Sequence, residues 1–202
     1  MSSSKRRRVS EYHSVLTADN TTPRCIPRSR FARRSLDGAG WLSNRAFYFY
    51  LSPADDHCFH SPMAGLVERF VDLGHLPRCS ASVKSDLMGS RPSILLHNRR
   101  CLLVLRNGDG FSLAMVIVGG FLVDSLRIDA SVREGAKLEK GQFVGSFALG
   151  GSAVVMLTDG PGGGLELEEG LREAMTGSVL VKINMGRDLG RIYNSQSVSQ
   201  SS

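Results

Sequence analysis

Short apolar runs separated by glycine-rich turns constrain the fold of this 202-residue chain more than any other feature. Residues 100–105 (RCLLVL) and 111–118 (FSLAMVIV) flank the turn sequence Asn107-Gly108-Asp109-Gly110, and such a pattern is typical of a β-hairpin. Five further runs have the same strand character: residues 46–51, 122–128, 143–147, 153–157 and 179–183. Helical character is confined to residues 165–175, where acidic side chains come early, as the helix dipole favours. The sequence therefore predicts a mainly β (α+β) domain with few short helices.

Glycines recur at a regular spacing in residues 132–145 (VREGAKLEKGQFVG), with apolar residues between them. Gly135, Gly141 and Gly145 fall where tight turns need positive φ. A weaker copy of the pattern follows at residues 181–190. This rhythm resembles the turns of lipoyl- and biotinyl-domain-like barrels, which implies a barrel-like β sandwich closed by both segments. The lysine is not at a lipoylated position, so no carrier role is expected.

Positive charge is concentrated at the N-terminus. The whole chain has a formal charge of +6, whereas residues 1–36 hold nine basic and two acidic side chains, a local charge of 9 − 2 = +7. We predict a disordered basic arm over residues 1–45, a core over 46–192 and a disordered tail over 193–202. The arm is open to several interpretations: a solvated tail, a mitochondrial transit-like sequence or a contact for anionic lipid. Nucleic-acid binding is not expected, because the core has no aromatic and basic surface pattern to support it.

The four cysteines show no metal-binding spacing, and reduced thiols with no bound metal are expected. The apolar run at residues 113–123 contains two glycines and is much shorter than the eighteen or so residues that span a bilayer. Any membrane role is therefore expected to be peripheral.

Two segments could carry chemistry. In residues 51–65 (LSPADDHCFHSPMAG), His57 and His60 follow a predicted strand and could transfer protons near neutral pH, although a histidine pair is more often structural. In residues 147–157 (FALGGSAVVML), Gly150 and Gly151 precede Ser152 at the entry to a buried strand. A backbone of this kind can be strained and closely approached, but most such triplets are simple turns.

Taken in order, these segments resemble the phosphatidylserine decarboxylase family over about residues 46–192. The pattern L-S-P-x-D-x-H-x-F-H-S-P comes first, and K-G-x-x-V-G-x-F-x-x-G-G-S-x-V-V comes last. The part between them is carried by Asn98, Arg100, Val118–Gly120, Val123, Ser125 and Leu126.

The resemblance implies a proenzyme that cuts itself between Gly151 and Ser152 into a β chain (1–151) and an α chain (152–202). Ser152 would be the nucleophile and then the precursor of a pyruvoyl group, the one cofactor expected. His60 matches the base for self-cleavage, and His57 matches the histidine associated with proton delivery during decarboxylation. Asp55 and Gly150 would support the site.

The implied reaction converts phosphatidylserine to phosphatidylethanolamine and CO₂ at an anionic membrane surface. The implied location is the mitochondrial inner membrane or another endomembrane. Two alternatives stay open: a decarboxylase of soluble amino acids in the same family, and a non-catalytic homologue that kept the fold.

Three departures from the family pattern bear on that choice. Asp56 and Cys58 replace a tyrosine and an arginine of the motif, Ala64 stands where an aspartate often follows it, and no A-D-G segment precedes the histidines. The family uses the aspartate of that segment in self-cleavage. Asp37, Asp55 and Asp56 are the candidates for its role.

Overall fold

The computed structural model describes residues 12–18, 45–51, 55–74, 98–119, 126–148, 152–158, 163–176 and 181–194. Most of these residues lie in strands. The strands are β1 Tyr12–Ala18, β2 Arg45–Leu51, β3 Cys58–His60, β4 Gly65–Asp72, β5 Arg100–Arg106, β6 Ser112–Val118, β7 Leu126–Ile128, β8 Lys137–Leu138, β9 Phe143–Phe147, β10 Ser152–Thr158, β11 Gly163–Leu167, β12 Val181–Asn184 and β13 Gly190–Asn194. The helix α3 spans Glu169–Thr176.

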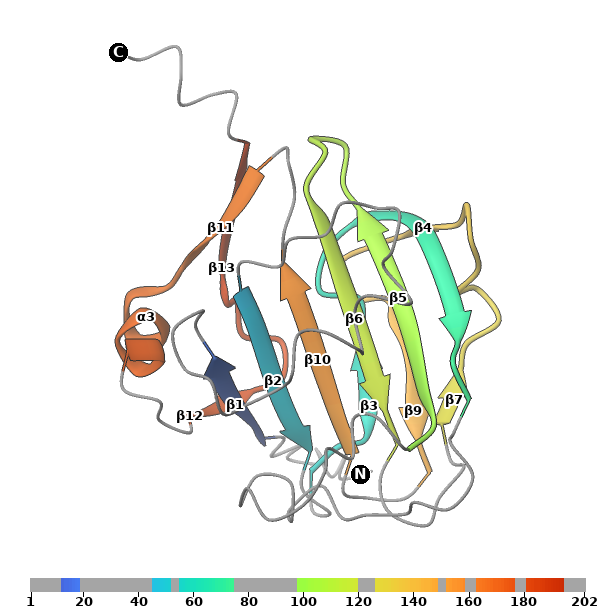
Figure 1. Ribbon diagram of the computed structural model, residues 1–202, viewed down its shortest axis with the longest axis horizontal. Coiled ribbons are helices and arrows are strands. Elements are labelled where there is room, and N and C mark those ends of the chain that lie inside the picture. The colour runs from blue at the N-terminus through green and yellow to red at the C-terminus, as the bar shows by residue number, and fades with distance from the viewer. Residues whose placement is uncertain are drawn as a thin grey trace, which may run out of the picture.

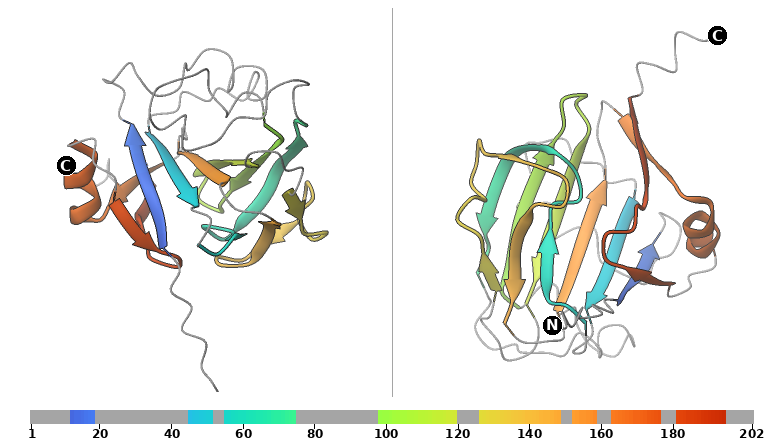
Figure 2. Two further views of the ribbon diagram at one scale, coloured as in Figure 1. Left: turned by 90° about the horizontal axis from the view of Figure 1, so that it is seen from below. Right: turned by 180° about the vertical axis from the view of Figure 1, so that it is seen from behind.

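The strands form one large sheet and two small ones (Figure 1). The large sheet has eight strands in the order β12-β1-β2-β10-β6-β5-β4-β8, and its neighbouring strands are antiparallel. A three-stranded sheet, β3-β9-β7, lies against one face of it, as the view from behind shows (Figure 2). The ribbon β11-β13 lies beside them near α3. A mainly β fold is thus confirmed.

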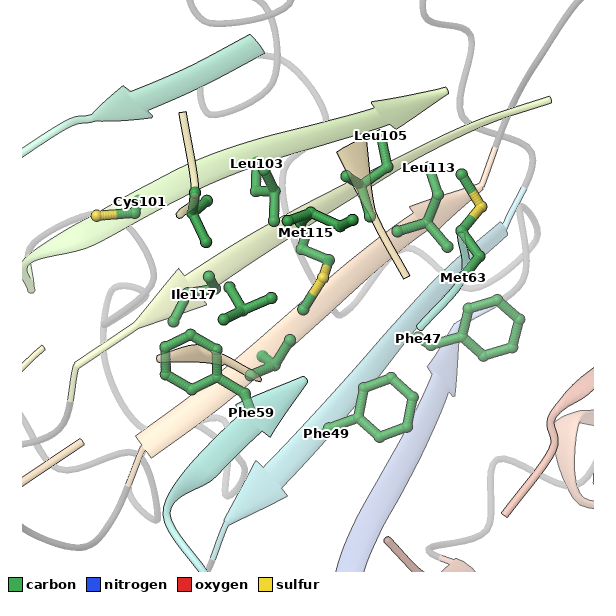
Figure 3. Packing of buried hydrophobic residues seen from close by; sticks show 14 of the residues in the cluster. Phe47, Phe49, Phe59, Met63, Cys101, Leu103, Leu105, Leu113, Met115 and Ile117 are labelled. Carbon is green, nitrogen blue, oxygen red and sulfur yellow. The ribbon is translucent and has the colours of Figure 1, made fainter. Parts of the chain in front are cut away.

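The main hydrophobic core fills the space between the two larger sheets (Figure 3). Successive side chains of a strand point to opposite faces, so Phe47, Phe49 and Leu51 of β2 all enter this core. Phe59 and Phe147 enter it from the three-stranded sheet, with ring centroids 5.0 Å apart. Each fully buried side chain of this size contributes about 1.5–3 kcal/mol to folding. A second cluster, which includes Leu102, Val104, Val116 and Val155, occupies the opposite face of the large sheet.

The predicted hairpin is confirmed as β5 and β6, which pair along their whole length. Asn107 holds the turn, because its side-chain oxygen accepts hydrogen bonds from the N–H groups of Asp109 and Phe111. The predicted strands at 46–51, 143–147, 153–157 and 179–183 correspond to β2, β9, β10 and β12. The strand expected at 122–128 is described only as β7, because residues 122–125 lie outside the described part of the chain.

The prediction of one helix over residues 165–175 is wrong in its first part. Residues up to Leu167 belong to β11, and the helix begins at Glu169. The reason is the alternating Leu165-Glu166-Leu167, which suits a strand of period two and pairs with β13.

The prediction of a disordered arm over residues 1–45 is wrong for Tyr12–Ala18, which form β1. This strand lies between β2 and β12, with Val15 opposite both Phe49 and Val181. Its partners are distant in sequence, so its order depends on tertiary pairing rather than on local composition. β13 likewise runs two residues into the predicted tail, to Asn194. The rest of the arm and of the tail lies outside the described residues.

Both copies of the glycine pattern use their glycines in the same two ways. Gly141 and Gly186 turn the chain with φ of 79° and 80°, as predicted. Gly145 and Gly190, four residues later, are not turn residues: they lie in strands where another backbone passes too close for a Cβ atom. A Lys140–Asp188 ion pair joins the two turns, and the hydrogen bond and charge of Lys140 lower the pKa of Asp188.

Candidate active site

Four strand ends bring the two chemically important segments to one edge of the sandwich, the lower edge in Figure 1. β10 begins at Ser152, opposite Leu51 at the end of β2. β9 ends at Phe147, whose N–H donates a hydrogen bond of 2.8 Å to the carbonyl oxygen of His57. β3 starts at the next residue, Cys58. His57 and Ser152 therefore lie at the same end of the core, although 95 positions separate them in the sequence.

Ser152 is fully buried, with 0% of its surface exposed. Its Oγ has no hydrogen-bond partner in the described part of the protein. Because side chains alternate along a strand, this hydroxyl shares a face with Val154, which belongs to the core between the sheets. A buried hydroxyl without a partner costs about 1–3 kcal/mol, so its retention there indicates a role other than stability.

His57 presents a second buried polar atom of this kind. Its Nε2 is buried and has no hydrogen-bond partner among the residues that the structure describes. The turn that carries it is held by Asp56, whose carboxylate accepts a 3.0 Å hydrogen bond from the N–H of Cys58. Asp56 thus shapes the backbone around His57.

His60 lies at the other end of β3. It pairs with Phe143, and the two rings meet edge to face with centroids 5.8 Å apart. His60 comes three residues after His57, so an extended backbone places their Cα atoms about 10 Å apart. The next residue, Ser61, exchanges backbone hydrogen bonds with the turn at Gly141 and Gln142. The structure therefore brings His57, rather than His60, to the edge where Ser152 begins β10.

The other predicted site residues are placed less directly. Burial raises the pKa of Tyr50, and the nearby charge of Asp55 raises it further. Leu51 enters the core between the sheets, so its neighbour Tyr50 points to the opposite face of the large sheet. Because the charge of Asp55 acts on Tyr50, that charge lies near the same opposite face. Gly150, Gly151 and Asp37 lie outside the described residues.

A polar group from β5 and β6 supports the same edge. The side-chain amide of Asn98 donates a 2.8 Å hydrogen bond to the carbonyl of Gly119, and Arg100 donates to the carbonyl of Asn98 at 3.1 Å. Val118 lies opposite both Arg100 and Ala153, so these bonds secure the strand next to Ser152. Partial burial lowers the pKa of the Arg100 guanidinium. In the sequence, Asn98 and Arg100 were visible only as residues of the family motif. Their hydrogen bonds to the backbone became visible only in the structure.

Asp72, Arg99 and Cys101 form a cluster that sequence reasoning missed. Arg99 and Asp72 form an ion pair at 2.9 Å, and Asp72 lies opposite Cys101. Burial tends to raise the pKa of Asp72, but hydrogen bonds from Arg99 and Gly74 and the charge of Arg99 together lower it. Burial, with the charge of Asp72, raises the pKa of the Cys101 thiol from 9.0 to about 12. Asp72 lies 27 positions before Arg99 in the sequence, so no local pattern signalled this cluster.

Cys101 is expected to resist alkylation in the folded protein, because it is 0% exposed and keeps its proton. With iodoacetamide at pH 8, peptide mapping should find label on the half-buried Cys58 and none on Cys101. In denaturant both should react. Between pH 9 and 12 the unfolded thiol loses its proton while the folded thiol keeps it, so this group makes unfolding easier as the pH rises. Equal native labelling of the two cysteines would contradict the assignment.

The described residues contain no group of three or more histidine, cysteine or acidic side chains that could hold a metal ion. None of the helical structure described for this chain is long and apolar enough to cross a membrane.

The sequence matches the family model described as phosphatidylserine decarboxylase over residues 26–191. The chain is similar to phosphatidylserine decarboxylase proenzyme 2 of rice (Oryza sativa subsp. japonica), with 29% identity over 143 residues, which are 70% of this chain and 22% of the rice protein. It is 32% identical to proenzyme 2 of Komagataella phaffii over 111 residues, which are 54% of this chain and 10% of that protein. It is 28% identical to the Pseudomonas fluorescens proenzyme over 159 residues, which cover 70% of this chain and 51% of that protein.

The chain thus spans between a tenth and about half of the length of these curated relatives. No solved structure is significantly similar to it. The family match covers most of the chain and includes the segments that carry His57, His60 and Ser152. This chain belongs to the phosphatidylserine decarboxylase family.

Proposed function

We propose that this protein is a pyruvoyl-dependent decarboxylase that cuts itself between Gly151 and Ser152 and converts phosphatidylserine to phosphatidylethanolamine and CO₂. The observation that carries the proposal is the buried hydroxyl of Ser152, which has no partner within the described structure and begins a central strand beside the His57 segment. The relatives are named as proenzymes, which supports processing of a precursor.

The position of Ser152 fits a pyruvoyl group. Residue 152 is the first residue of β10, which is held between β2 and β6, so a group formed there would be fixed by two neighbouring strands. Fully buried surroundings would also keep water away from it. When present, such a group supplies an electron sink for the loss of CO₂ from an amino-acid head group.

Side chains of the protein would carry out the proton transfers, and strand pairing would hold the cut chains together. The buried Nε2 of His57 has no partner in the described structure, and it could hold or deliver a proton during decarboxylation. Cutting before residue 152 would leave the α chain paired with the β chain along both edges of β10. The two chains would therefore stay together without a covalent link.

Assays on vesicles distinguish this proposal from its alternatives. Purified protein should release CO₂ from vesicles of phosphatidylserine and phosphatidylcholine at least tenfold faster than from free serine or tryptophan. Vesicles of phosphatidylcholine alone are the control for background release. Release from free amino acids alone would favour the soluble decarboxylase. An uncut chain that releases no CO₂ from any of these substrates would favour the non-catalytic homologue, to which the departures at Asp56 and Cys58 point.

A further inference from the structure

We infer that Asn98 is a positioning residue for self-cleavage, because its side-chain amide fixes the backbone of Gly119 at the level of Ser152. This inference rests on the proposed function. Asn98 would act on the cut through the backbone of β6 and would not touch the reacting atoms. The grounds are the strand register around Ser152 and a buried hydrogen bond at the end of β6.

The first ground is the register on both sides of Ser152. Ser152 lies opposite Leu51 of β2, and the next residue, Ala153, lies opposite Val118 of β6. These strands are antiparallel, so Gly119, which follows Val118, continues the register to the level of Ser152. Adjacent strands are about 4.8 Å apart, and Gly119 has no side chain, so β6 contributes only backbone beside Ser152.

The second ground is the hydrogen bond that Asn98 makes at this point. The paired positions of β5 and β6 run as far as Arg100 and Val118. Beyond them, the N–H of Gly119 donates to the carbonyl of Arg99 at 2.9 Å, and the amide of Asn98 donates to the carbonyl of Gly119 at 2.8 Å. Asn98 is 5% exposed, and its own carbonyl accepts a bond from the Arg100 guanidinium, which holds the donor in place. Asn98 therefore fixes the backbone at the end of β6.

The chemistry of the proposed cut is sensitive to that backbone. Oγ of Ser152 bonds to the carbonyl carbon of Gly151, the C–N bond between them breaks, and the hydroxyl proton ends on the released amine. Elimination of the Gly151 carboxylate, with loss of the Cα proton of residue 152, then separates the chains. The atoms that bond first belong to adjacent residues, so φ and χ1 of Ser152 set the distance between them. A misplacement of about 1 Å can cost about 10²-fold in rate, so an anchor on the neighbouring strand should speed the cut.

The first test compares two asparagines at opposite ends of the β5–β6 hairpin. Asn98→Ala removes the donor to Gly119, and formation of the fragments 1–151 and 152–202 should slow by about 10- to 100-fold. Asn107→Ala is the matched control, because the Asn107 side chain also bonds to the backbone, but at the turn. Each variant should lose about 2–8 °C in Tm, yet Asn107→Ala should cut at close to the wild-type rate. Cleavage is followed on denaturing gels after cell-free synthesis of the full chain, at a temperature well below each Tm.

A second variant makes the donor depend on pH. In Asn98→Asp the neutral carboxyl can donate to the Gly119 carbonyl, whereas the carboxylate cannot donate and repels that oxygen. Burial raises the pKa of a carboxyl group, so the neutral form should be reached in mild acid. The cleavage rate of Asn98→Asp relative to the wild type should rise by about tenfold or more from pH 8 to pH 5, while that of Asn98→Ala stays constant. This variant also provides the test if Asn98→Ala does not fold.

Three results would overturn the inference. They are cleavage of Asn98→Ala at the wild-type rate, equal slowing of Asn98→Ala and Asn107→Ala, and a relative rate of Asn98→Asp that does not change with pH. Equal slowing would show that lost stability alone delays the cut. A wild-type chain that never cuts would instead overturn the proposed function itself.

Discussion

Replacing Ser152 by alanine is expected to leave the 21.9 kDa chain in one piece and to abolish release of CO₂. Alanine lacks the oxygen that would attack the Gly151 carbonyl in the proposed self-cleavage, and it cannot become a pyruvoyl group. The losses should be complete rather than graded, because the residue that would attack is also the residue whose carbon atoms would form the pyruvoyl group. A denaturing gel of freshly purified protein and a CO₂ assay on phosphatidylserine vesicles are the measurements.

Folding of this variant should be unaffected or slightly improved. The buried Oγ has no partner in the described structure, so its removal takes away a desolvation cost and breaks no hydrogen bond. Ser146→Ala, in the half-buried middle of β9, is the matched control and should still be cut. Two fragments from Ser152→Ala would show that the cut lies elsewhere or has another nucleophile.

Gly145→Ala is expected to destabilise the protein by about 3 kcal/mol and to slow self-cleavage. A Cβ atom at this position would collide with the carbonyl oxygen of Arg127 and come within 2.7 Å of the Phe59 ring. Both neighbours are fixed, one as backbone and the other in the core, so β9 must move away from β3 and β7. That movement would disturb the hydrogen bond between Phe147 and His57, which holds the His57 segment beside the end of β9.

Thermal unfolding measures the effect, which for a chain of this size corresponds to a fall in Tm of about 10 °C. Gly108→Ala is the matched control, because nothing lies within 4 Å of the added Cβ and the backbone there does not have positive φ. Its Tm should change by no more than about 2 °C. Equal stability of the two alanine variants would contradict the close approach of the backbone at Gly145.

The sequence pattern predicted an element correctly where the residues that stabilise the element lie within it. The hairpin of β5 and β6 has a turn held by Asn107 within the segment itself, and both strands were predicted from it. The turn at Gly141 needed only a glycine able to adopt positive φ. By contrast, β1 is a strand because β2 and β12 flank it, and Leu165–Leu167 became a strand because β13 pairs with them. Such partners are remote in sequence, so periodicity within one segment does not reveal them.

The same distinction between local pattern and tertiary contact applies to the candidate site. The motifs around His57, His60 and Ser152 were visible in the sequence, and the family match includes all three. The bonds from Asn98 and Arg100 to the backbone, and the Asp72–Arg99–Cys101 cluster, appeared only with the fold. The Asn98–Gly119 bond and the Arg99–Asp72 pair join residues 21 and 27 positions apart, and the pairing of the strands brings them together.

The sequence by itself determined the family and the mainly β class, because these depend on motif order and on short-range pattern. The tertiary structure decided which histidine lies at the end of the core where Ser152 begins β10. His57 and His60 are three residues apart in the sequence, and the motif alone does not show how each lies relative to Ser152. The antiparallel pairing of β3 with β9 separates them, because it places one at the edge where β10 starts and the other about 10 Å further along the strand.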